Sequence, residues 1–112
     1  MSAHIWVSYP PCEHCGNPGA EGAEVNITYN LSPMLHAAGF VGWRELAAMS
    51  ARDAGRHVLA VLDGMRNDPK RWLAMNPPNG WGYYDECLQG RLRRWAETAS
   101  KESPAARVGA SL

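Results

Sequence analysis

The chain has 112 residues, 46% of them hydrophobic, which suits one domain with a single modest core and is too little for two. Eleven Lys and Arg residues balance eleven Asp and Glu residues, so the formal net charge is zero. A neutral chain lacks the broad basic field that drives nonspecific nucleic-acid binding, which excludes a polynucleotide as the main partner.

The charge is nevertheless divided unevenly along the chain. Positions 1–43 carry Glu13, Glu21 and Glu24 and no Lys or Arg, so an anionic ligand should be met by the second half. No stretch approaches the roughly 18 apolar residues of a membrane span, and no basic region followed by an apolar run marks a secretory signal. We therefore expect a cytoplasmic protein that has no membrane partner.

Two strands are predicted at the start of the chain. Ile5, Val7 and Tyr9 recur at every second position until Pro10 and Pro11 end the pattern. The second strand, over 25–31, again has an apolar residue at every second position: Val25, Ile27, Tyr29 and Leu31. Its other face would carry three amide or hydroxyl groups, from Asn26, Thr28 and Asn30. The turn-rich stretch between the two strands predicts a hairpin.

Helix signals dominate the middle of the chain. Ser32 and Pro33, followed by Gly39, predict a short helix over 32–38. Ser50 stands three residues before Asp53 in a variant of the capping box, and a helix should run from there to about residue 67. Its inward face should consist of Ala54, Val58, Val61, Leu62 and Met65. Asp68 and Pro69 repeat the signal for a short helix that Pro77 and Pro78 stop.

The last predicted helix runs from about residue 83 to 99. Apolar residues at steps of three and four would face inward: Tyr84, Leu88, Leu92, Trp95 and Ala99. Positions 100–112 lack this periodicity and predict a mobile C-terminal tail behind a single globular domain of residues 1–99. The predicted fold class is α+β, with an N-terminal two-stranded β-hairpin carrying a CxxC turn and packed on three to four α-helices. Because an isolated hairpin is marginal, we expect a helix contact, a metal ion or a strand from a second subunit to support it, the last in a homodimer.

The CxxC pair, Cys12 and Cys15, is the clearest chemical motif, because such a turn brings two thiolates within reach of one zinc ion. The pair supplies half a tetrahedral site. His4 on the paired strand and His36 on the following helix are the best-placed completing ligands, with Cys87, His14 and His57 as alternatives. An unmetallated turn remains the competing interpretation. A redox role is disfavoured, because the turn residues after Cys15 should prevent the helix that would activate the first thiol.

A second candidate site is the connection over 76–85, which combines two prolines, two asparagines and two glycines with three large aromatic rings. Turn chemistry explains the first six, whereas the rings indicate a surface that packs against the core or a ligand. Trp81 between two glycines fits either role. Rings for stacking, amides for edge recognition and nearby cations would together form a small-molecule pocket. Its candidate residues are Asn26, Thr28, Asn30, Arg66, Arg71, Asn76, Asn79, Trp81 and Tyr83.

The common catalytic motifs are missing from the sequence: there is no nucleophile elbow, no P-loop and no H-E-x-x-H. Binding is therefore favoured over catalysis. With its CxxCG turn, the Asn26 to Met34 segment and the Asn76 to Tyr83 segment, the stretch over 9–98 resembles a group of small, uncharacterised proteins of bacteriophages and mobile elements.

That resemblance implies a viral counter-defence protein that binds a nucleotide-derived immune signal, such as a cyclic oligonucleotide or an ADP-ribose derivative. The alternatives are a module that inhibits a host protein, a zinc-stabilised structural domain and a zinc-dependent hydrolase.

Overall fold

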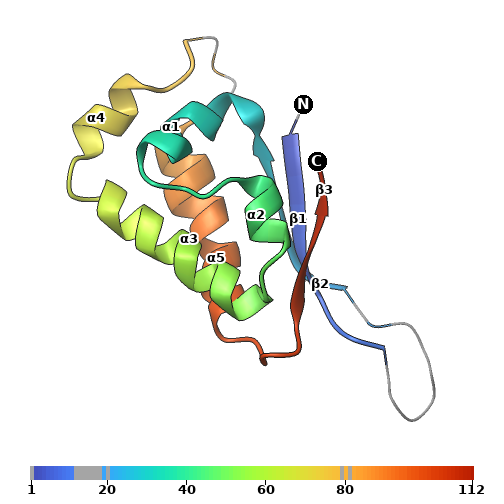
Figure 1. The fold of residues 1–112 in the computed structure, drawn as a ribbon. Helices are drawn as coiled ribbons and strands as arrows, with labels where there is room; N and C mark the ends of the chain where they lie inside the picture. Colours follow the sequence, from blue (N-terminus) through green and yellow to red (C-terminus); the bar gives the residue numbers. More distant parts are fainter. Residues whose placement is uncertain (1, 12–18, 20, 79, 81) are drawn as a thin grey trace.

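The computed structural model describes residues 2–11, 19, 21–78, 80 and 82–112 and has an α+β fold. A three-stranded antiparallel sheet forms one layer, and the helices pack on one of its faces (Figure 1). The strands are β1 (Ser2–Ser8), β2 (Glu21–Thr28) and β3 (Arg107–Ser111). Their order is β2-β1-β3, so the first strand lies in the middle.

The predicted antiparallel pairing of the first two strands is present. Ile5 pairs with Val25 and Ala3 with Ile27, and all four side chains are buried on the helix side. The second strand ends three residues earlier than predicted, because Tyr29–Leu31 form a 3-10 helix, η1. The Thr28 hydroxyl accepts a hydrogen bond from the Asn30 N–H at 3.3 Å and so caps that turn.

Residues 107–111 correct the predicted mobile tail, because they form the third strand of the sheet. Val108 pairs with Val7 of β1 and is only 7% exposed. The Ala51 N–H also donates to the Ala106 carbonyl at 2.9 Å, which ties the approach to β3 onto the helical layer. The domain therefore extends beyond residue 99. Helices packed on the sheet support the two-stranded unit, which is one of the three supports that the sequence suggested, and β3 adds a support that was not predicted.

The described residues contain five α-helices, one more than the upper predicted number, together with a π-helix. The α-helices are α1 (Ser32–Ala37), α2 (Trp43–Ala47), α3 (Ala51–Met65), α4 (Pro69–Ala74) and α5 (Arg93–Ser100). The π-helix η2 (Tyr84–Leu92) runs directly into α5, so the last predicted helix changes type partway. The predicted cap of α3 is confirmed, since the Ser50 hydroxyl accepts from the Asp53 N–H at 3.1 Å.

The core lies between the sheet and the packed pair α3 and α5 (Figure 1). All residues predicted to face inward on α3 and on the last helix are buried. Trp95, predicted to face inward, is 2% exposed, and Trp72 of α4 is a core residue at 4% exposure. Among the described residues, no helix combines the length and apolar character needed to cross a bilayer.

Candidate ligand-binding groove

The last helix places two arginines beside the outer edge of β2. Its apolar residues Leu88, Leu92 and Trp95 are buried against the core, so the positions between them face outward. Arg91 and Arg94 are both exposed and stand three residues apart, which puts their side chains on neighbouring positions of one helix side. Both η2 and α5 contact β2, so these arginines lie next to a sheet edge.

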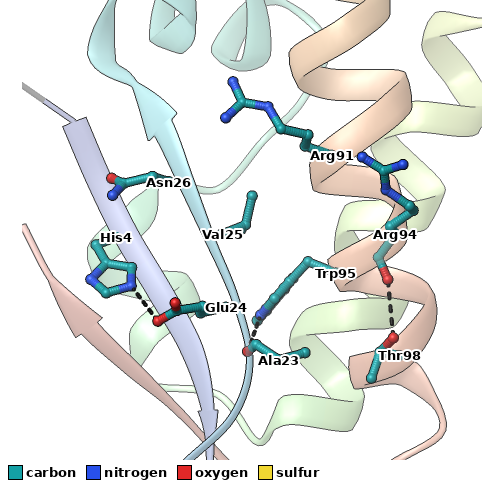
Figure 2. A pocket seen from close by; sticks show the side chains of 9 residues that line it. All are labelled: His4, Ala23, Glu24, Val25, Asn26, Arg91, Arg94, Trp95 and Thr98. Carbon is teal, nitrogen blue, oxygen red and sulfur yellow. Dashed lines mark hydrogen bonds and ion pairs between the residues drawn. The ribbon is translucent and has the colours of Figure 1, made fainter.

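A hollow of about 460 Å³ separates this helix side from β2, and we call it the sheet-edge hollow. Its size lies within the roughly 300–1,000 Å³ of typical small-molecule sites. Figure 2 shows Arg91 extending from the helix toward β2, with Arg94 on the next turn. The lining residues are His4, Ala23, Glu24, Val25, Asn26, Arg91, Arg94, Trp95 and Thr98.

A hydrogen bond across the base of this hollow holds its two walls together. The indole N–H of Trp95 donates to the Ala23 carbonyl at 3.2 Å (Figure 2). The Trp95 ring is 2% exposed, so it acts as part of the floor and offers little surface for stacking. The walls are therefore fixed by packing and a polar contact before any ligand arrives, which reduces the cost of ordering them on binding.

The strand wall of the hollow combines the apolar Ala23 and Val25 with the polar Glu24 and Asn26. Glu24 Oε2 accepts a hydrogen bond from His4 Nε2 at 3.0 Å, and Asn26 Oδ1 accepts one from the Ser2 hydroxyl at 2.7 Å. Glu24 is 67% exposed, and its second oxygen, Oε1, accepts no hydrogen bond from the described residues. A carboxylate oxygen is thus available to a donor that enters from solvent.

A second hollow of about 280 Å³, which we call the loop hollow, lies at the C-terminal end of β2. Its lining residues are Thr28, Gly80, Gly82, Tyr83, Glu86, Cys87 and Arg91. Gly82 has a φ of 135° and approaches β2 so closely that an added Cβ would lie 2.8 Å from Thr28 Cγ2. The described part of the 76–85 connection therefore approaches β2 at Thr28.

Arg91 lines both hollows, so they adjoin at its side chain, and we call the two together the arginine groove. Arg91 Nη2 donates to Cys87 Sγ at 3.1 Å, which positions its guanidinium between the two hollows. The Arg94 guanidinium makes no hydrogen bond or ion pair with the described residues. Two like charges on adjacent helix positions repel each other, and an anion between them would relieve that repulsion.

Some of the predicted ligand residues line the groove, one has a role in the fold, and one lies outside the groove. Asn26 lies in the sheet-edge hollow, while Thr28 and Tyr83 lie in the loop hollow, where Tyr83 is 47% exposed. Asn76 serves the fold, because its Oδ1 accepts from the Tyr84 N–H at 2.9 Å where η2 begins. Asn30 is exposed beyond the end of β2 and lines neither hollow.

The predicted cations lie elsewhere. Arg71 places its Cζ 4.5 Å from the centre of the Trp72 ring, and Arg66 is exposed at the end of α3. Neither lines the groove, whose cations are Arg91 and Arg94. The sequence contained a signal for these two, because they fall outside the apolar stripe of the last helix. It contained none for the strand that they face.

The predicted zinc ligands are not brought together in the described residues. His4 lines the sheet-edge hollow, whereas His36 lines a different hollow beside Trp43. No group of three or more His, Cys, Asp or Glu side chains in 2–11, 19, 21–78, 80 and 82–112 is arranged to hold a metal ion. Cys12 and Cys15 lie outside the described residues, as do Asn79 and Trp81 of the connection. The zinc site therefore stays a prediction.

No protein-family model, curated protein or solved structure matches the chain. The arginine groove is accordingly interpreted from its own chemistry.

Proposed function

We propose that this chain is a binding protein that sequesters an anionic, nucleotide-derived small molecule in the arginine groove. The observation that carries the proposal is the position of Arg91, which joins the hollow containing Arg94 to the hollow containing the exposed ring of Tyr83. A phosphate group would lie between the two guanidinium groups, because guanidinium binds phosphate through paired, charge-assisted hydrogen bonds. A base would stack on Tyr83, one hollow away.

The counter-defence role remains part of this proposal. A protein that captures a signalling nucleotide needs a site with positive charge, a stacking surface and edge-reading polar groups, and it needs no catalytic step. The groove offers Arg94 and Arg91 for charge, Tyr83 for stacking and the Asn26 amide for edge contacts. Capture of such a ligand would lower its free concentration in the host cytoplasm.

Calorimetry with ADP tests the proposal, using Arg94→Ala and a matched control. We expect wild type to bind ADP at micromolar concentration and Arg94→Ala to bind it about tenfold or more weakly, the usual effect of losing a hydrogen bond to a charged group. Arg66→Ala removes an exposed arginine outside the groove and should leave the affinity unchanged. An absence of ADP binding, or equal affinities for wild type and Arg94→Ala, would contradict the proposal.

A second candidate function, inhibition of a host protein, is favoured by one feature of α4. Leu73 and Met75 are 42% and 39% exposed there, beside the exposed Lys70 and Arg71. Exposed apolar side chains rimmed by charge are typical of protein contacts. This function predicts that Leu73→Ser abolishes capture of a host protein in a pull-down, whereas Arg94→Ala leaves that capture intact.

A further inference from the structure

The ends of the arginine groove differ chemically from its middle. Arg91 lines both hollows, and Arg94 lines the sheet-edge hollow beside it. A carboxylate lines each of the two hollows, Glu24 in the sheet-edge hollow and Glu86 in the loop hollow. Because carboxylates accept hydrogen bonds and guanidinium groups donate them, the groove matches a ligand with donors at both ends and an anion between them.

The loop hollow suits a nucleobase. The Tyr83 ring is 47% exposed and offers a face for stacking, and the exposed Glu86 carboxylate lines the same hollow. An exocyclic amino group of a base is a donor that a carboxylate can accept. Gly80 and Gly82 line the same hollow and add no side chain of their own to it.

The sheet-edge hollow suits a sugar with adjacent hydroxyl groups. Glu24 is held at one oxygen by His4 and presents the other to solvent. Acidic side chains commonly bind the hydroxyl groups of ribose in nucleotide sites. Asn26 lies two residues further along β2 and adds an amide beside that carboxylate.

We infer that the groove selects a nucleoside diphosphate with a terminal sugar, such as ADP-ribose, over a cyclic dinucleotide. This inference rests on the proposed function. The base occupies the loop hollow, the diphosphate lies along Arg91 and Arg94, and the terminal ribose meets Glu24. A cyclic dinucleotide has neither a linear diphosphate nor a free pair of neighbouring ribose hydroxyl groups, so it leaves the Glu24 carboxylate facing anionic phosphates.

Glu24→Gln gives a test in which charge and hydrogen bonding act in opposite directions. Removing a negative charge beside the arginines should by itself strengthen binding of any anion. Loss of the carboxylate as a paired acceptor should instead weaken binding of a ligand that places a ribose there, by about tenfold. Glu24 is exposed, and glutamine keeps the size of the side chain, so the variant should fold normally.

Calorimetry of wild type and Glu24→Gln with ADP-ribose, ADP and cyclic di-AMP separates the outcomes. We expect Glu24→Gln to bind ADP-ribose about tenfold more weakly and ADP equally or more tightly. Equal or tighter binding of ADP-ribose by Glu24→Gln, weaker binding of both ligands, or a wild-type preference for cyclic di-AMP would overturn this inference alone. Failure of wild type to bind ADP would overturn the proposed function itself.

Discussion

Gly55 lies at the contact between α3 and α5, and its replacement by alanine tests how tightly these helices are packed. A Cβ at Gly55 would lie 2.5 Å from the Ser100 backbone nitrogen and 2.7 Å from the Ala96 carbonyl oxygen. Both atoms belong to the backbone of α5, so no side-chain rotation can relieve the overlap. The two helices would have to move apart, which loosens the core around them.

Two opposing terms determine the expected effect. Alanine is favoured over glycine in a helix interior by about 1 kcal/mol. Overpacking a core costs about 1–3 kcal/mol, and the upper end applies because backbone must move. Gly55→Ala should therefore lower the free energy of unfolding by about 2 kcal/mol, which corresponds to a fall in Tm of about 8–16 °C for a domain of this size.

Gly64→Ala is the matched control, because Gly64 lies in the same helix and an added Cβ would meet no atom within 4 Å. This variant gains helix propensity without overlap and should raise the free energy of unfolding by about 0.5–1 kcal/mol. Urea unfolding followed by circular dichroism measures both variants. A Gly55→Ala protein as stable as wild type, or a shift of both variants in the same direction, would refute the reasoning.

Acid pH should weaken the fold through His57, whose pKa is lowered from 6.5 by burial and whose Nε2 accepts from the Val41 N–H at 3.3 Å while the ring is neutral. Below pH 6.5 the unfolded chain binds a proton at His57 more readily than the folded chain does, so the free energy of unfolding decreases as the pH is lowered. His57→Gln should therefore make the urea midpoint less dependent on pH, and an equal pH dependence in wild type and variant would contradict this. Val108→Asp should destabilise the sheet by about 3 kcal/mol, because it buries a charge in β3, and a near-normal urea midpoint would show that the strand contributes little. Asn76→Ala should cost about 1 kcal/mol by removing the acceptor for the Tyr84 N–H, while Asn76→Asp, which keeps an oxygen there, should cost less; equal losses in thermal unfolding would argue against that role.

The helices were predictable where a local signal decides the backbone. Ser50 and Asp53 mark the start of α3, and Pro69 marks the start of α4, because caps and first-turn prolines act on their own neighbours. The buried stripe of the last helix was also predictable. Its change from π-helix to α-helix was not, since the steps of four from Tyr84 to Leu92 suit either type.

The third strand was not predictable from its own residues. Arg107–Ser111 contains one large apolar side chain, Val108, and a glycine, Gly109, which usually weakens a strand. What makes the segment a strand is its partner, β1, which lies about a hundred residues away in the sequence. The Trp6 ring lies so close over Gly109 that a Cβ there would overlap it, so the glycine suits this register.

The candidate site was predictable in part for a similar reason. The sequence indicated a ring-bearing connection and a polar strand as parts of one pocket, and Gly82 of that connection does approach Thr28 of that strand. It assigned the cations by their distance along the chain, which favoured Arg66 and Arg71. Proximity in the fold selects Arg91 and Arg94 instead, because α5 and η2 contact β2 while Arg71 stacks on Trp72.

The strand order links the third strand to the groove. Because β3 pairs with the free edge of β1, the sheet grows on the side away from Arg91 and Arg94, and β2 remains an edge strand beside them. If β3 had paired with β2 instead, its backbone would occupy the space of the sheet-edge hollow. The Trp95 hydrogen bond to Ala23 then fixes this uncovered edge at one point without closing it. The segment predicted to be a mobile tail therefore supports the sheet and leaves β2 as an edge strand.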